Sequence, residues 1–185
     1  VPRVTLTVSA TSIAENAGSS LTLTATLSKT AAENVTVTLG TSGAATEGTD
    51  YGSLSNITVT AGSLTGTTTF TPTDDSIYDA TSNETATVSI DSVSGGDALE
   101  NGTQSVTITI TDNDSAPTVT LSRSAAAIDE NSSSTVTITA TLSNTTYQDV
   151  TVSIGASGGT EGTDYATISD ITISAGSTTG TTSLD

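Results

Sequence analysis

A pattern that recurs about 115 residues along the chain constrains the fold more than any other feature. The segment Val-Thr-Leu at 4–6 recurs at 119–121, and Thr-Glu-Gly-Thr-Asp-Tyr at 46–51 recurs at 160–165. Further matches lie between these points in the same order, which shared composition does not explain. Internal similarity at a fixed spacing indicates a repeated structural unit. We therefore expect the chain to contain two copies of one domain.

The expected boundary follows the Asp-Asn-Asp sequence at 112–114, so that the two domains span 1–114 and 115–185. The second copy reaches only the position equivalent to Thr71, and we expect it to lack the last two strands of the first copy. A sandwich without those strands leaves hydrogen-bonding groups open along a sheet edge. Two explanations stay open: the sequence is a piece of a longer array, or another chain completes the second domain by β-augmentation.

Each copy consists of short segments in which Val, Ile or Leu alternates with Thr. This alternation is typical of half-buried β-strands, and Gly, Asn and Asp mark turns between the segments. In the first copy we predict seven strands, near 3–9, 20–29, 34–40, 54–60, 65–72, 84–93 and 104–111. Many short strands with regularly spaced turns indicate an all-β sandwich or barrel.

Charge and composition exclude several classes of function. The net charge is −17 with only three basic residues, so neither nucleic acid nor an anionic membrane is an expected partner. No apolar segment approaches the roughly 20 residues of a membrane span, so membrane insertion is not expected. The chain has no His and no Cys, which removes the commonest general base and the thiol nucleophile. We therefore do not expect an enzyme.

The most concentrated acidic stretch contains Asp74, Asp75 and Asp79, with Glu84 shortly after it. No Lys or Arg lies near this stretch in the sequence. Because carboxylates at close range repel one another, the folded chain must bind a cation, protonate them or leave them in water. Ca²⁺ takes six to eight oxygen ligands of this kind. The stretch therefore indicates either a calcium site or a solvated acidic loop that keeps the protein soluble.

Four segments in the order Ile-Ala-Glu-Asn-Ala-Gly at 13–18, Glu-Gly-Thr-Asp-Tyr at 47–51, Asp-Asp-Ser-Ile-Tyr-Asp at 74–79 and Asp-Asn-Asp at 112–114 resemble the Calx-β domain. The resemblance covers the whole first copy and the available part of the second. It implies an immunoglobulin-like, seven-stranded β-sandwich in tandem, with the second sandwich incomplete. Calx-β domains of sodium–calcium exchangers bind Ca²⁺ at loops at one end, and many others are repeats in bacterial surface proteins.

The resemblance also implies a set of Ca²⁺ ligands from the loops of the first copy, with Asn113 contributing an amide oxygen between two carboxylates. Two equivalents follow in the second copy. The expected ligands are Glu15, Asp50, Asp74, Asp75, Asp79, Glu84, Asp112, Asn113, Asp114, Glu130 and Asp164.

The leading hypothesis is a structural extracellular repeat module, a Ca²⁺-stiffened stalk or extender of a bacterial surface adhesin. Its expected partners are neighbouring repeats or identical subunits, with a host or surface ligand bound elsewhere in the full protein. One alternative is a subunit of a secreted, self-assembling surface filament that exchanges strands between subunits. Another is a calcium-sensing regulatory module, as in the exchangers.

Overall fold

The chain is all-β, as the alternation of aliphatic residues and Thr predicted. The structure is a computed structural model that describes residues 1–79, 83–131 and 133–185, with Asn83 described by its backbone alone. Contacts divide the chain into unit 1, comprising Val1–Asp75 and Thr81–Asn113, and unit 2, comprising Ser76–Ala80 and Asp114–Asp185. Each unit is taken by itself below.

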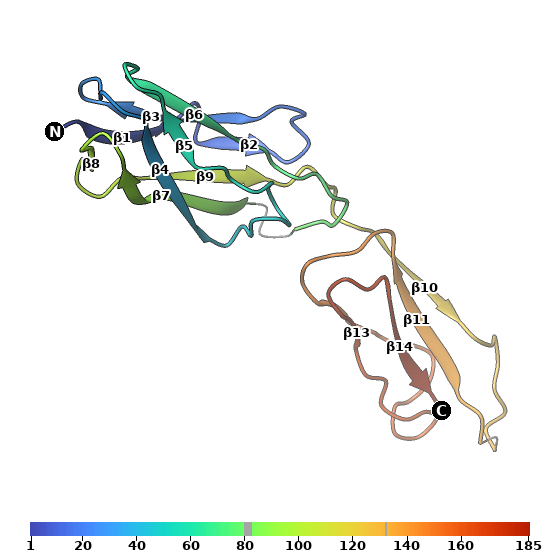
Figure 1. Cartoon of the computed structure of the whole chain (residues 1–185). Helices are drawn as coiled ribbons and strands as arrows, with labels where there is room; N and C mark the ends of the chain where they lie inside the picture. Colours follow the sequence, from blue (N-terminus) through green and yellow to red (C-terminus); the bar gives the residue numbers. More distant parts are fainter. Residues whose placement is uncertain (80–82, 132) are drawn as a thin grey trace. The chain divides into compact units, whose positions relative to one another are not determined.

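Unit 1 is a sandwich of two sheets (Figure 1). One sheet has the order β6-β3-β1-β8 and the other has the order β2-β9-β7-β4-β5. The strands are β1 (Arg3–Val8), β2 (Ser12–Ala14), β3 (Leu21–Leu27), β4 (Val35–Gly43), β5 (Ile57–Val59), β6 (Thr65–Phe70), β7 (Asn83–Ser94), β8 (Leu99–Glu100) and β9 (Ser105–Thr111). All neighbouring strands are antiparallel except two pairs, β1 with β8 and β2 with β9.

The period of two in the sequence decides which side chains enter the core of unit 1. Along β3, Leu21, Leu23, Ala25 and Leu27 are buried, and the Thr residues between them are partly exposed. The same alternation places the aliphatic residues of β4, β7 and β9 between the sheets. Small aliphatic side chains therefore form most of this core, and each contributes a modest apolar area.

Two aromatic residues are the largest of the fully buried side chains that the structure describes. Tyr51 and Phe70 are 1% and 0% exposed, and their rings stack with centroids 4.6 Å apart. Tyr51 also forms a backbone bridge to Pro72, and Gly52 N donates to the Thr71 carbonyl. The stacked pair thus ties the turn before Tyr51 to the loop that follows β6, and this loop leads toward the candidate site.

Unit 2 contains β10 (Val119–Arg123), β11 (Val136–Leu142), β12 (Val150–Val152), β13 (Ile171–Ile173) and β14 (Thr179–Leu184). These form a three-stranded sheet of order β10-β11-β14 and a two-stranded sheet β12-β13 (Figure 1). The registers repeat those of unit 1: Val119 faces Leu142 as Val4 faces Leu27. The repeat in sequence is thus a repeat in strand pairing.

Two strands of unit 1, β2 and β8, were not predicted from the sequence. They contain three and two residues, too few to display an alternation, and both pair in parallel with strands distant in sequence. The short β2 proves important because it carries a candidate ligand at its end. In the part of the chain that the structure describes, no helix has the length and apolar character to cross a membrane.

Candidate metal centre

The candidate centre begins with the parallel pairing of β2 and β9. Ile13 pairs with Ile110 and Ala14 with Thr111, both Ile side chains are buried, and Glu15 N donates to the Thr111 carbonyl at 3.1 Å. Because the strands run in the same direction, the residues that follow them leave the sheet at the same end. This register places Glu15 beside Asp112, although 97 positions separate them in the sequence.

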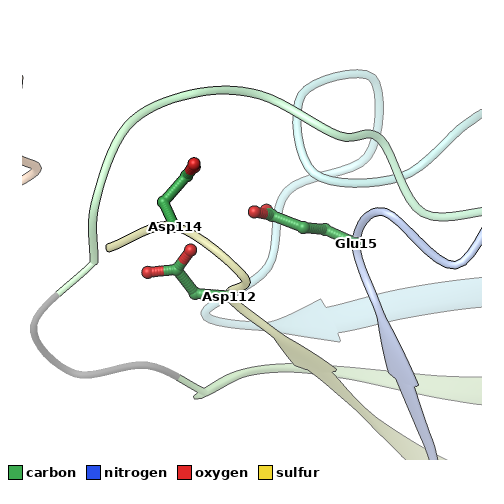
Figure 2. A group of neighbouring side chains, drawn as sticks. All are labelled: Glu15, Asp112 and Asp114. Carbon is green, nitrogen blue, oxygen red and sulfur yellow. The ribbon is translucent and has the colours of Figure 1, made fainter. Parts of the chain in front are cut away.

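Asp114 joins these two residues from the segment that follows β9. Ligand oxygens of Glu15, Asp112 and Asp114 all lie within 4.8 Å of one another, and all three residues are partly buried. Figure 2 shows the three side chains, with Glu15 reaching toward the two aspartates from the end of its strand. Oδ2 of Asp114 is buried from solvent. The backbone N–H of Asn113 donates to Oε1 of Glu15 at 3.4 Å, which helps to hold the glutamate in place.

Three carboxylates at this separation repel one another, and partial burial weakens the screening by water. A divalent cation would relieve the repulsion and accept the oxygens as ligands. Carboxylate and carbonyl oxygens suit Ca²⁺ or Mg²⁺, and the absence of His and Cys excludes the nitrogen and sulfur ligands that favour zinc and copper. Ca²⁺ fits this group better than Mg²⁺, because Ca²⁺ accepts irregular coordination whereas Mg²⁺ demands near-ideal octahedral geometry.

Asp74 belongs to the loop after β6, and in Figure 2 this loop arches around the three carboxylates. A hollow of about 200 Å³ is lined by residues of the β2 turn, including Glu15, and by Thr71, Pro72 and Asp74. Asp74 is exposed and lies outside the group of three. Asp74 thus lines the same hollow as Glu15, and it is a candidate ligand that would lie farther from an ion than the three clustered carboxylates.

Asp50 has a structural task in the turn before Tyr51. Its Oδ2 accepts a hydrogen bond from Thr46 N at 2.6 Å, and its carbonyl accepts one from Thr73 N at 2.9 Å. The carboxylate therefore closes its own turn, an arrangement typical of Asp in loops. Asp50 lies outside the group of three, and its predicted role as a ligand stays a prediction.

The remaining predicted residues of the first copy are outside the group of three. Asp75 is exposed, Asp79 is buried at 7% and belongs to the segment that clusters with unit 2, and Glu84 is partly buried opposite Ile110 on β7. Asn113 is exposed and participates through its backbone N–H. Among the described residues, Glu15, Asp112 and Asp114 are the group of three or more carboxylates close enough to share an ion.

In unit 2, Glu130 and Asp164 line a hollow of about 440 Å³ together with Asp129. Asp164 closes its turn as Asp50 does, with Oδ2 accepting from Thr160 N at 2.7 Å. The carboxylates of this hollow do not meet within the distance that defines the group in unit 1, as far as the described residues show. The turn is thus repeated, and the described residues of unit 2 form no group of three carboxylates of this kind.

The sequence motifs named all three members of the group, and the emphasis of the prediction lay on the acidic stretch at 74–79. Density of acidic residues pointed to 74–79, whereas the described structure concentrates carboxylates where two strand ends meet. Asp112 directly follows the alternating segment 105–111, but the three residues of β2 before Glu15 carry no alternation. The sequence therefore contained no sign that these two residues meet, which depends on the parallel register of β2 and β9.

Comparisons with known proteins bear on the fold. No family model matches the chain, and no curated protein matches it. A solved structure described as CBD12 from CALX1.2 is 16% identical, covers 98% of this chain and 73% of its own, and has a TM-score of 0.52. The apo-form Calx CBD1 domain (17% identical, 60% and 99% covered) and CBD12 of CALX1.1 (18% identical, 94% and 71% covered) have TM-scores of 0.49 and 0.48. The fold is therefore Calx-β-like, as the sequence resemblance predicted.

Proposed function

We propose that this chain is a calcium-binding structural module in which Ca²⁺ joins the end of β2 to the segment that follows β9. The observation that carries the proposal is the convergence of Glu15, Asp112 and Asp114 within 4.8 Å. The sequence motifs at these three residues and the Calx-β-like fold support it. No catalytic role is assigned to the chain.

The position of the cluster explains what an ion would do there. Asp112 and Asp114 belong to the segment that leads from β9 into the second copy, and Glu15 belongs to the sandwich itself. A Ca²⁺ ion held by all three would tether this segment to β2 and reduce its freedom. Because an ion that binds only the folded state stabilises it by RT ln(1 + [L]/Kd), millimolar Ca²⁺ would stabilise unit 1.

This tethering suits a stalk or extender of a bacterial surface adhesin, with neighbouring repeats as its partners. Extracellular Ca²⁺ is abundant, so even a site of modest affinity would be filled there. The net charge of −17 supports the same environment, since bound Ca²⁺ would reduce the repulsion within the acidic chain. We therefore propose that the chain lies at the cell surface as part of an adhesin.

Calorimetric titration of the full chain with CaCl₂ tests the proposal. We expect saturable binding that the Asp112→Asn, Asp114→Asn double variant weakens at least about tenfold, because two of the clustered charges are removed. The matched control is Glu33→Gln, which removes a charge from an exposed loop residue before β4 and leaves the cluster intact. Equal affinity in the parent chain and the double variant would reject the site.

A second candidate function, a self-assembling surface filament, is supported by strand edges of unit 2. In the described residues, β10 pairs with β11 alone and β12 pairs with β13 alone, so each has an open edge. Subunits joined head to tail at such edges would polymerise without limit. Sedimentation velocity of the intact chain over a range of concentrations tests this function. Polymers would favour the filament, and a monomer at all concentrations would exclude it.

A further inference from the structure

The connection between β8 and β9 in unit 1 has a reactive sequence that the calcium proposal does not use. It contains Asn101, Gly102 and Thr103, which are all exposed, and it includes the only Asn-Gly sequence in the chain. Gly102 adopts a φ of +69°, and a Cβ added there would meet no atom within 4 Å. The connection therefore lies open to water and has room for its backbone to move.

The reacting groups of this sequence are free of hydrogen bonds. The backbone of Asn101 is held, because its N–H donates to the Val4 carbonyl at 3.0 Å and its carbonyl accepts from Nε2 of Gln104 at 2.7 Å. Its side-chain amide has no hydrogen bond to any described residue, and the N–H of Gly102 has none either. The side-chain carbonyl carbon and the next backbone nitrogen can therefore approach each other without breaking a contact.

An asparagine followed by glycine can close a five-membered ring on itself. The backbone nitrogen of Gly102 would lose its proton to water and attack Cγ of Asn101, and the side-chain nitrogen would take up a proton and leave as ammonia. Water then opens the resulting succinimide at either carbonyl, which yields aspartate or isoaspartate. In sum, one amide and one water become a carboxylate and an ammonium ion. Glycine favours the ring closure because it has no Cβ to obstruct the attacking nitrogen.

Four other asparagines show what distinguishes this site. The N–H of Ala17, which follows Asn16, already donates to a backbone carbonyl at 3.1 Å. Asn34 and Asn56 accept backbone hydrogen bonds through Oδ1, and each is followed by a β-branched strand residue. Oδ1 of Asn144 accepts from the very N–H that would have to attack, at 2.9 Å. Because branched side chains and hydrogen bonds both hinder ring closure, the Asn-Gly sequence is the expected first site of reaction.

The carbonyl of Asn101 also takes part in closing the edge of β1. The parallel pairing of β1 with β8 covers only the first two residues of β1. Beyond them, Oε1 of Gln104 accepts from the N–H of Leu6 at 3.3 Å, and Nε2 of the same amide donates to the Asn101 carbonyl. The backbone N–H of Gln104 is fixed in turn by Oε1 of Glu100 at 2.6 Å. A side-chain amide is thus inserted between two main chains and caps the next N–H of β1.

We propose that Asn101 is a site of spontaneous deamidation and that isoaspartate formation there opens the edge of β1. In isoaspartate the main chain gains a methylene group and runs through Cβ, so the former backbone carbonyl of residue 101 becomes a carboxylate outside the main chain. The amide of Gln104 then loses its fixed acceptor, and the N–H of Leu6 loses its cap and is left at an open strand edge. Because the ammonia is lost, the change is not reversed, and its extent records the age of the protein.

Ageing the full chain in mildly alkaline buffer tests the chemistry. We expect peptide mapping by mass spectrometry to find conversion of residue 101 before that of any other asparagine, with isoaspartate distinguished from aspartate by electron-transfer fragmentation. A free peptide of residues 98–106 gives the reference rate, and the folded chain is expected to react within about fivefold of it, because the connection is exposed. A slower reaction than that, or faster conversion at another asparagine, would overturn the proposal.

Two variants of the same connection test the ring mechanism. Asn101→Gln keeps an amide but would need a six-membered ring, which closes far more slowly, so we expect no conversion at residue 101 over the same period. Thr103→Ala leaves the reacting atoms unchanged and is expected to convert at the parent rate. Both positions are exposed, so both variants are expected to fold like the parent. Conversion of Asn101→Gln at the parent rate would contradict the succinimide route.

Hydrogen exchange at the Leu6 amide tests the structural consequence. We expect exchange at least about tenfold faster in the aged parent than in the fresh chain, approaching that of fresh Gln104→Ala, which lacks the capping amide. Fresh Asn101→Asp adds the charge without lengthening the main chain, and its Leu6 amide is expected to stay protected. Unchanged exchange at Leu6 in the converted chain would overturn the opening of the edge. Equal acceleration in fresh Asn101→Asp would contradict isoaspartate as its cause.

Discussion

Leu6 and Leu121 occupy equivalent positions in units 1 and 2, yet one is 5% exposed and the other 57%. Both lie on a strand with the sequence Val-Thr-Leu, and both strands pair with the next in the same register. The difference comes from the opposite sheet, which in unit 1 includes β7 and β9. An alternating sequence therefore defines which face of a strand is apolar, and the rest of the fold decides whether that face is buried.

Two further pairs of positions show where the units are alike. Leu27 and Leu142 are 2% and 3% exposed, and Ile57 and Ile171 are both fully buried. These residues depend on β3, β5 and β6, or on their equivalents β11, β13 and β14, all of which are present in both units. Burial is thus shared wherever the contacting strands are shared.

The largest expected effect comes from truncating the leucines that differ. Leu6→Ala should lower the free energy of unfolding by about 2–4 kcal/mol, because it leaves a cavity in a closed core. Leu121→Ala should change stability by less than about 0.5 kcal/mol, since the side chain is already exposed. Denaturant unfolding followed by hydrogen exchange in each unit measures both values.

The leucines that are alike provide the control for this comparison. Leu27→Ala and Leu142→Ala both remove a buried side chain, and both should destabilise their own units by at least about 2 kcal/mol. A negligible effect of Leu142→Ala would mean that unit 2 has no cooperative core, and the contrast between Leu6 and Leu121 would then lose its meaning.

An intermediate effect is expected at a glycine that both units retain. A Cβ added to Gly66 would overlap the Thr58 carbonyl, and one added to Gly180 would overlap the Thr172 carbonyl. Because the backbone must move in either case, Gly66→Ala and Gly180→Ala should each cost about 1–3 kcal/mol. Thermal unfolding, combined with hydrogen exchange measured separately in each unit, tests whether the two losses are similar. A large loss of stability in only one unit would contradict the expected similarity.

The smallest expected effect concerns the aspartate that closes the repeated turn. Asp50→Ala and Asp164→Ala each remove the acceptor for a backbone N–H, at 2.6 and 2.7 Å, and should cost about 1 kcal/mol. The loss should spread further in unit 1, where the adjacent Tyr51 is buried and stacked on Phe70, than in unit 2, where Tyr165 is partly exposed. Amide exchange at 46–52, compared with the equivalent turn at 160–166, measures this difference.

The main features of the fold could be predicted from the sequence because they rest on local patterns. Alternation along 21–27 and 35–39 identified strands and their buried faces, and the repeat identified a second unit with the same pairing. The short strands β2 and β8 could not be predicted, because two or three residues carry no period and their partners lie nearly 100 positions away.

The candidate site was predictable in composition and not in arrangement. Glu15, Asp112 and Asp114 carry motifs of the resemblance, but their convergence depends on the parallel register of β2 and β9. Asp50 illustrates the opposite case, in which an acidic residue in a repeated motif is engaged by its own turn. A motif reveals that a carboxylate matters, and only the surrounding hydrogen bonds distinguish a turn closure from a candidate ligand.

The most direct measurement is hydrogen–deuterium exchange of the full chain in millimolar Ca²⁺ and in chelator. If Ca²⁺ binds where Glu15, Asp112 and Asp114 converge, amides at the end of β2 and in the segment after β9 will be protected by Ca²⁺ more than any in β10–β14. Unchanged exchange at those two places, whatever happens elsewhere in the chain, would contradict the proposed centre and leave the three carboxylates as a solvated end of the sandwich.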